Sequence, residues 1–287
     1  MPAAAVWVAG ARPRTLPAAV VPVAVGTATL DAWPIWWRAA AALIVSLALQ
    51  VGTNYVNDYA DGERGTDERR VGPVRLVGGG LATAGQVKRA AASAFGVAAV
   101  VGLALALAVG PELVAVGAVS IVAGWAYTGG PKPYGYLGLG EVFVFVFFGL
   151  VATVGSAYVH VERITGLAVV AAIPVGLLAV ALLVINNLRD IPGDTESGKR
   201  TLAVRLGDPA TRTLYVGLLL GTGLGVVACG FSRPPALIGL VGLATAVGPV
   251  RQVLAGASGA DLIPTLGATG RTQLVTGLLL AIGLAVG

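Results

Sequence analysis

Charged residues, cysteine and histidine are scarce in this sequence. Only 11% of the 287 residues are Asp, Glu, Lys or Arg, whereas soluble domains carry about 25%. The single cysteine, Cys229, cannot form an internal disulfide. The single histidine, His160, has no cysteine partners, which argues against a zinc site. These shortages exclude an ordinary soluble domain, a disulfide-stapled fold and a zinc enzyme.

Long apolar runs are what the sequence has instead. Hydrophobic residues make up 56% of the chain, and a helix needs about 20 mainly apolar residues to cross a bilayer core. Nine runs approach that length, at about 15–31, 35–56, 88–109, 112–129, 138–159, 165–188, 211–231, 234–255 and 271–287. The sequence therefore predicts an all-α, polytopic membrane helix bundle of about nine transmembrane helices, forming a single domain over residues 1–287.

The basic residues lie mostly in the loops between these runs. A net charge of +5 also occurs in proteins that bind nucleic acid, but short basic loops between apolar runs are typical of orientation in a bilayer. With a cytoplasmic N-terminus and nine alternating helices, 16 of the 19 Lys and Arg residues face the cytoplasm, and only Arg38, Arg163 and Arg233 do not. We expect a multi-pass protein of the cell membrane, with no nucleic-acid partner.

Two polar segments repeat one pattern. Asn54 precedes Asp58 by four residues, and Asn186 precedes Asp190 by four residues, so the two pairs are offset by 132 positions. Four predicted helices separate them, which places both on the cytoplasmic side. This spacing indicates an internal duplication, with four-helix halves at about 15–129 and 138–255 and a last helix at 271–287; the alternative is chance similarity between two charged loops. Paired polar motifs in two halves point to a site at their interface, facing a central cavity.

Each polar segment places acids and amides on one helix face. The first has Asn54, Asp58 and Asp61 at i, i+4 and i+7, and the second has Asn186, Asp190 and Asp194 at i, i+4 and i+8. Carboxylates at a membrane helix end are costly unless they face a polar cavity or a cation. Mg²⁺ prefers oxygen ligands and binds through one or two carboxylates plus substrate phosphates. We predict that these six residues hold Mg²⁺, with Mn²⁺ as an alternative.

Basic residues follow each acidic segment. Arg64, Arg69, Arg70 and Arg75 follow the first, and Lys199, Arg200 and Arg205 follow the second. Arginine forks and lysine ammonium groups bind phosphate oxygens, so acids for a metal next to bases for an anion suit a metal–diphosphate site. The alternative is that these side chains only anchor the helices at the inner surface. We predict that the diphosphate is bound by Asn57, Arg64, Arg75, Lys199 and Arg200.

These segments resemble a known family. NDYADGERGTD (57–67) and NNLRDIPGDTESGKRTLAVRLG (186–207) are similar to the two Asp-rich motifs of the UbiA-type intramembrane prenyltransferases. The resemblance spans about residues 11–285, and it is closest to the 1,4-dihydroxy-2-naphthoate polyprenyltransferase branch through ARPRTLPAAVVPVAVGTA (11–28), RVGPVRLV (70–77), YTGGPKPYGYLGLGE (127–141) and GKRTLAVRLG (198–207). Many relatives carry a third acid four residues after the second; here that position is Gly65, and Asp67 follows instead.

The resemblance implies a reaction. A polyprenyl group is transferred from polyprenyl diphosphate to 1,4-dihydroxy-2-naphthoate, with loss of CO₂ and diphosphate, giving demethylmenaquinone. It implies that Asp58, Asp61, Asp190, Asp194 and Lys199 form the catalytic centre, with Mg²⁺ offsetting the charge that develops on the departing diphosphate.

The acceptor side is less constrained by the motifs. We assign Arg14, Tyr127 and Glu141 to acceptor binding, because they lie at helix ends on the cytoplasmic side. Phe143, Phe145, Phe147 and Phe148 either line the prenyl cavity or pack against lipid and neighbouring helices. Two alternatives remain open: prenyl transfer to another aromatic acceptor, such as 4-hydroxybenzoate or homogentisate, and an ion-coupled secondary transporter with its ions at the paired motifs.

Overall fold

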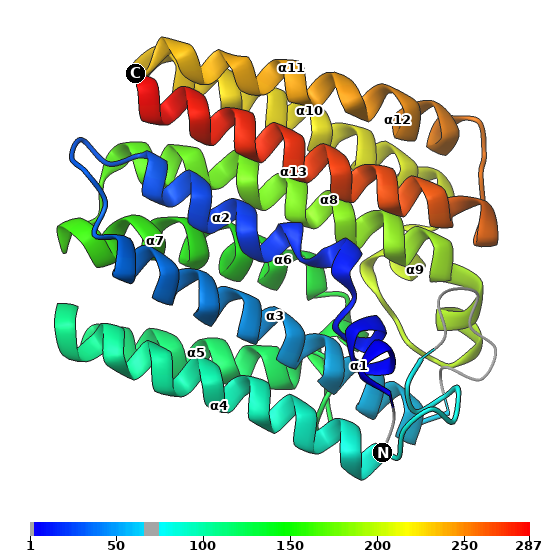
Figure 1. The fold of residues 1–287 in the computed structure, drawn as a ribbon. Helices are drawn as coiled ribbons and strands as arrows, with labels where there is room; N and C mark the ends of the chain where they lie inside the picture. The colour runs from blue at the N-terminus through cyan, green and yellow to red at the C-terminus, as the bar shows by residue number, and fades with distance from the viewer. Residues whose placement is uncertain (1–2, 66–74) are drawn as a thin grey trace.

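The computed structural model describes residues 3–65 and 75–287. Within those residues the protein is all-helical and contains no strand. A short helix, α1 (Ala4–Ala11), precedes α2 (Pro17–Ala28), α3 (Trp36–Glu63), α4 (Ala84–Val109) and α5 (Glu112–Ala126). The long helices run nearly parallel to one another, and the C-terminal ends of α3 and α8 lie at the same end of the bundle (Figure 1).

The helices in the second part of the chain pack into the same bundle. The helices α6 (Gly140–Val144), the π-helix η3 (Phe145–Val151) and α7 (Ala152–Val161) form one continuous span, followed by α8 (Gly166–Glu196) and the short α9 (Leu202–Leu206). Next come α10 (Asp208–Ser232), the segment from η4 (Pro234–Ile238) through α11 (Gly239–Leu243) to α12 (Val247–Leu254), and α13 (Leu262–Val286). Figure 1 shows α4 and α5 on one flank, α10 to α12 on the other, and α2 beside α13 between them.

Seven helices in the described part of the chain are long and apolar enough to cross a membrane. Two shorter apolar helices, Pro17–Ala28 and Glu112–Ala126, occupy the positions of the other two predicted spans. At a rise of about 1.5 Å per residue they are shorter than the roughly 30 Å hydrocarbon core. The all-helical membrane class is therefore confirmed, while the count of nine spans and the duplicated halves remain predictions.

Helix α8 is the centre of the bundle. In its most apolar stretch 72% of the residues are buried, more than in any other candidate span of the described residues. It extends to Glu196, eight residues beyond the predicted end at 188, and passes through Pro192 without breaking. Asn186, Asp190 and Asp194 therefore all lie on helix, as the i, i+4, i+8 spacing predicts. The last helix also differs from its predicted start, because α13 begins at Leu262 rather than at 271.

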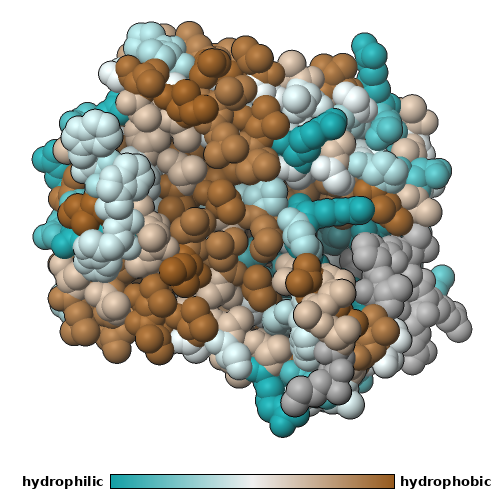
Figure 2. All heavy atoms as spheres, viewed as in Figure 1, coloured by the Kyte–Doolittle hydropathy of each residue, from teal (hydrophilic) through white to brown (hydrophobic). Residues whose placement is uncertain are grey.

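The surface agrees with a lipid environment. Large apolar side chains are exposed along the helices, including Leu107 and Leu224. Figure 2 shows hydrophobic residues over the middle of one face, with hydrophilic residues gathered toward its two edges. An apolar girdle between polar ends is the surface that a membrane-spanning bundle presents to lipid and water.

The π-helix η3 approaches α8 at backbone contact. A Cβ built on Gly149 meets the Cα of Gly176 at 2.6 Å, so this crossing requires glycine. We expect Gly149→Ala to cost about 1–3 kcal/mol of unfolding free energy, because backbone atoms cannot move aside as a side chain can. Such a cost lowers the unfolding midpoint by roughly 2–4 °C per kcal/mol.

The midpoint can be measured with a fluorogenic thiol dye, because the single cysteine, Cys229, is fully buried until the bundle opens. Gly217→Ala on α10 is the matched control, since a Cβ at Gly217 meets nothing within 4 Å. Equal midpoints for the two variants would show that the η3–α8 crossing is not close-packed.

Candidate active site

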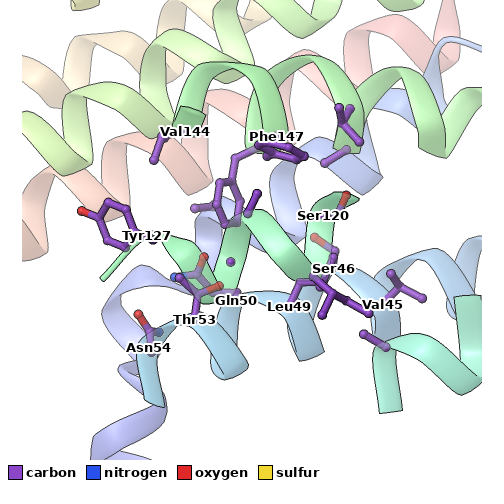
Figure 3. Close-up of a pocket in the computed structure, with 18 of the residues that line it drawn as sticks. Val45, Ser46, Leu49, Gln50, Thr53, Asn54, Ser120, Tyr127, Val144 and Phe147 are labelled. Atoms are coloured by element: carbon purple, nitrogen blue, oxygen red, sulfur yellow. The ribbon is translucent and has the colours of Figure 1, made fainter. Parts of the chain in front are cut away.

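A cavity of about 730 Å³ is lined by residues of α3, α4 and α5, of the span from α6 to α7, and of α8. Figure 3 shows Gln50, Thr53 and Asn54 of α3 on one side and Val144 and Phe147 on the opposite side, with Tyr127 near one end. Most of the lining is apolar and includes residues of α2, α4, α5 and α7. An elongated apolar cavity with polar groups at one end suits a ligand that has a long hydrocarbon chain and a charged head.

The polar end of the cavity is rich in arginine. Arg12, Arg14, Arg75 and Arg189 line it together with one carboxylate, that of Asp58. Arg12 has a left-handed backbone with φ of 55°, a conformation that non-glycine residues rarely adopt, and its guanidinium donates to the carbonyl of Asn54 at 3.4 Å. Arg189 is paired with Asp190, but the guanidinium groups on the lining still outnumber the carboxylates, which makes this end of the cavity attractive to a negatively charged head group.

The first acidic segment is fixed by backbone contacts. Asp58 is only 1% exposed, and its two carboxylate oxygens accept the backbone N–H groups of Leu76 and Val77, each at 3.0 Å. The amide of Asn54 donates to the carbonyl of Ala11 at 2.9 Å and to the hydroxyl of Thr15 at 3.2 Å. Asp58 therefore holds the backbone at residues 76 and 77, in addition to facing the cavity.

One lysine joins the two acidic segments. The ammonium of Lys199 lies 3.5 Å from Asp61 Oδ2 and 4.0 Å from Asp194 Oδ1. Asp61 is on α3, Asp194 is on α8, and Asp61 is only 2% exposed. Lys199 thus lies between one acid of each segment.

The middle of the second segment pairs within itself. Arg189 donates two hydrogen bonds to the carboxylate of Asp190, from Nε and Nη2, each at 2.7 Å. Its Nη2 also donates to Asn186 Oδ1 at 2.9 Å. Arg189 and Asn186 line the cavity, as do Asn57 and Asp58 of the first segment. The sequence motifs assigned no role to Arg189; the signal for it was its position directly before Asp190.

The remaining predicted residues fall into two groups. Arg14, Asn57, Arg75 and Tyr127 line the cavity. Arg64, Arg200 and Glu141 do not line the cavity. Arg64 donates to the carbonyls of Thr128 and Gly130, and Arg200 is exposed. Glu141 is buried and accepts a hydrogen bond from Asn187 at 2.9 Å. Asp67, Arg69 and Arg70 lie outside the described residues.

The aromatic residues of the fifth predicted helix divide between two faces. Phe143, Phe147 and Phe148 line the cavity, whereas Phe145 packs against the core around α8, where a Cβ on Gly176 would meet its ring at 2.7 Å. Phe143 stacks on Tyr134 at a centroid distance of 3.9 Å and lies 6.0 Å from Phe147. The π-helical turn shifts the register here, and such turns are frequent at functional sites.

Two tyrosines at this end of the cavity stay protonated. Burial raises the pKa of Tyr134 above the ordinary tyrosine value. Burial, followed by the nearby Glu141 carboxylate, raises the pKa of Tyr127 well above it. Both hydroxyls are therefore neutral hydrogen-bond donors over the whole physiological pH range.

The donor atoms fit a magnesium ion bound together with phosphate. No group of three or more His, Cys, Asp or Glu side chains within the described ranges is close enough to hold a metal alone. Mg²⁺ needs only one or two protein carboxylates when phosphates complete its shell, and Asp61 and Asp194 already face one cation, Lys199. The buried Oδ1 of Asn57, on the cavity wall, has no hydrogen-bond partner among the described residues and is a further oxygen donor.

The Asp58 contacts generate a prediction. We expect Asp58→Ala to speed amide hydrogen exchange at Leu76 and Val77 by about 10- to 100-fold, because a hydrogen bond to a charged group contributes about 1.5–3 kcal/mol. Peptide-resolved exchange in detergent measures this. Asp208→Ala is the control, since Asp208 pairs with Arg212 within α10 and not with residues 76 and 77. Unchanged exchange at residues 76 and 77 would show that Asp58 does not hold this segment.

Comparison with known proteins shows the family of this chain. The model of the UbiA prenyltransferase family matches residues 19–266. The chain is 49% identical over 284 residues to the 1,4-dihydroxy-2-naphthoate octaprenyltransferase of Mycobacterium tuberculosis, covering 98% of this chain and 97% of that protein. It is 36% identical over 296 residues to the enzyme of that name from Escherichia coli, covering 97% and 94%.

Solved structures share the fold at much lower identity. A UbiA homolog from Archaeoglobus fulgidus, bound to GPP and Mg²⁺, matches with a TM-score of 0.69 at 12% identity, covering 98% of this chain and 99% of that one. The apo structure of a UbiA homolog from Aeropyrum pernix matches with a TM-score of 0.73 at 12% identity, covering 93% and 97%. With a family match over most of its length and close relatives along nearly all of it, this multi-pass membrane protein belongs to the UbiA prenyltransferase family.

Proposed function

We propose that this protein transfers a polyprenyl group from polyprenyl diphosphate to 1,4-dihydroxy-2-naphthoate, with loss of CO₂ and diphosphate, giving demethylmenaquinol, the reduced form of demethylmenaquinone. Three relatives that are 36–50% identical to this chain carry the name 1,4-dihydroxy-2-naphthoate octaprenyltransferase. The observation that carries the proposal is the meeting of two acidic helix ends around Lys199, beside an apolar cavity whose polar end is lined by four arginines.

The donor's diphosphate lies at the polar end of the cavity in this proposal. Asp58, Asp61, Asp190 and Asp194, with Asn54 and Asn186, hold Mg²⁺, or alternatively Mn²⁺. The ion supplies positive charge that stabilises the departing diphosphate. Asn57, Arg64, Arg75, Lys199 and Arg200 bind the phosphate oxygens; of these, Asn57 and Arg75 already line the cavity. Because Lys199 contacts both acidic segments, its ammonium group can stabilise the negative charge that develops on the departing diphosphate.

The apolar part of the cavity accepts the prenyl chain. Each buried CH₂ contributes about 0.8 kcal/mol, so a long chain binds strongly in such a lining. Exclusion of water also protects the allylic cation that forms when the carbon–oxygen bond to diphosphate breaks. The faces of Phe143 and Phe147, which stack along the wall, are suited to stabilise that cation.

The acceptor is a flat aromatic anion. Arg14 and Tyr127, assigned to it from the sequence, line the cavity, and Arg12 and Arg189 add two further guanidinium groups there. A carboxylate bound by an arginine fork at this end holds the ring next to the reacting carbon of the donor. Glu141 acts from behind this wall, where it accepts a hydrogen bond from Asn187.

We propose that the site opens at the cytoplasmic side of the cell membrane. The C-terminal ends of α3 and α8 lie at the same end of the bundle (Figure 1). The positive-inside distribution, with 16 of the 19 basic residues on that side, supports this orientation.

The acceptor assignment is tested by mass spectrometry of the product. Purified protein in lipid is given Mg²⁺ and one prenyl diphosphate, together with an equimolar mixture of 1,4-dihydroxy-2-naphthoate, 4-hydroxybenzoate and homogentisate. We expect one prenylated product, with the mass of naphthoate plus the prenyl group less CO₂. A prenylated benzoate or homogentisate as the main product would show that the acceptor assignment is wrong. Ion-driven uptake into proteoliposomes with no prenyl transfer would show that the protein is a transporter instead.

The acidic site is tested with Asp194→Asn. Asp194 is less deeply buried than Asp58 and does not hold the segment at residues 76 and 77. Its substitution is therefore expected to lower activity without unfolding the protein. We expect kcat to fall about 100- to 1,000-fold, the magnitude found when one charge-stabilising group is removed. Asp261→Asn, an exposed acid before α13, serves as the control and keeps full activity. Near-normal turnover in Asp194→Asn would contradict the site.

A further inference from the structure

The loop between α5 and α6 carries a side chain that contacts the first acidic segment and the lysine that follows the second. Tyr136 lies in the short 3₁₀ helix η2 (Tyr134–Leu137). Its hydroxyl donates to Asp61 Oδ1 at 2.6 Å. The ammonium of Lys199 lies 4.9 Å from the centre of its ring, and the guanidinium of Arg64 lies 5.1 Å from it. One side chain therefore touches an acid of the first segment and a base that follows each segment.

These contacts link Tyr136 to both Asp61 and Lys199. The two oxygens of Asp61 are divided between partners: Oδ1 accepts from Tyr136, and Oδ2 faces Lys199 at 3.5 Å. A hydrogen bond from a neutral hydroxyl fixes the rotation of a carboxylate, and such supporting contacts determine how well the carboxylate binds a metal. The hydroxyl of Tyr136 thus sets the direction of the remaining lone pairs of Asp61.

The ring of Tyr136 contacts two cations, Arg64 and Lys199. Arg64 and Lys199 carry like charges, so their approach to one place is unfavourable without a negative partner. The face of an aromatic ring carries partial negative charge and attracts both. Arg64 is held further by the carbonyls of Thr128 and Gly130, which belong to the same loop. The loop therefore brings two phosphate-binding side chains together through Tyr136.

The backbone of the loop places Tyr136 there. Gly135 donates to the carbonyl of Tyr127 at 2.9 Å, and a Cβ at that position would meet the same oxygen at 2.7 Å. Gly138 ends η2 with a φ of 74°, and a Cβ on it would meet the side chain of Arg205 at 2.8 Å. Two glycines thus let η2 pack between the loop start at Tyr127 and the chain that follows the second acidic segment.

We propose that Tyr136 is a positioning residue that couples the two acidic segments: its hydroxyl orients Asp61 for the divalent cation, and its ring holds Arg64 and Lys199 for the diphosphate of the donor. The inference rests on the proposed function, since it concerns the metal–diphosphate end of the same site. It assigns two separable roles to one side chain, and the two roles predict different responses to two substitutions.

The test measures binding without turnover. Stabilisation of the full-length protein in detergent is followed through the reactivity of Cys229, with Mg²⁺ titrated at fixed inorganic diphosphate and diphosphate titrated at saturating Mg²⁺. Tyr136→Phe keeps the ring and loses the hydroxyl. It is expected to raise the half-saturating Mg²⁺ concentration about 10- to 100-fold and to leave the diphosphate half-saturation at saturating Mg²⁺ within about two-fold of the wild-type value, since the ring contacts persist. Tyr136→Leu also removes the ring, and it is expected to raise the diphosphate half-saturation about 10-fold or more as well.

The matched control is Tyr158→Phe. Tyr158 donates to the carboxylate of Glu112 at 2.6 Å, the same kind of contact at the same distance, but away from the acidic segments. It should leave both titrations unchanged. An unchanged Mg²⁺ titration in Tyr136→Phe overturns the role of the hydroxyl, and identical diphosphate titrations in Tyr136→Phe and Tyr136→Leu overturn the role of the ring.

Steady-state kinetics separate this inference from the proposed function. In Tyr136→Leu we expect KM to rise for the prenyl diphosphate and to change little for the aromatic acceptor. If the wild-type protein transfers prenyl groups but the Tyr136 variants match it in both titrations, only the inference fails. If the titrations respond to Tyr136 as stated but the wild-type protein transfers no prenyl group, the proposed function fails and the positioning role stands.

Discussion

The contact of Lys199 with Asp61 and Asp194 is the interaction on which the arrangement of the site depends. Buried carboxylates repel one another and lose hydration, so two of them approach at a helix end only when a cation lies between them. Lys199 supplies that cation from the chain itself, at 3.5 Å from one acid and 4.0 Å from the other. The C-terminal ends of α3 and α8 are thereby joined at one point, although the two acids are far apart in the sequence.

The remainder of the fold keeps this point polar and the space beside it dry. Helix α8 is buried through most of its length and carries both the second acidic segment and part of the cavity wall. The cavity changes along its length from guanidinium groups near Asp58 to aliphatic and aromatic side chains. Arginines that line one end attract an anionic head, while the apolar end accepts a hydrocarbon chain. A prenyl diphosphate has that same division, which is why one cavity can position both of its parts.

Much of this could be predicted from the sequence because it depends on local spacing. The i, i+4, i+7 spacing puts Asn54, Asp58 and Asp61 on one helix face, and the i, i+4, i+8 spacing does the same for Asn186, Asp190 and Asp194. The long apolar runs predicted the membrane class. Contacts across the chain could not be predicted in this way. Tyr136 lies 75 residues from Asp61, and no periodicity connects a loop tyrosine to a distant helix. The extension of α8 through Pro192 was missed because proline usually ends a helix. The pairing of Arg189 with Asp190 was missed because adjacent residues on a helix do not usually face each other.

The most direct test of the account is whether Asp61 and Asp194 lie together in the membrane-embedded protein. Cysteines replace both acids in a Cys229→Ser background, and a protease site is inserted at 162–165, in the loop between α7 and α8. After treatment with a short thiol cross-linker and cleavage, the account predicts that the two fragments remain joined on a denaturing gel, and that a control pair at Asp61 and Asp208 separates. Fragments that separate in both cases would contradict the meeting of the two acidic helix ends.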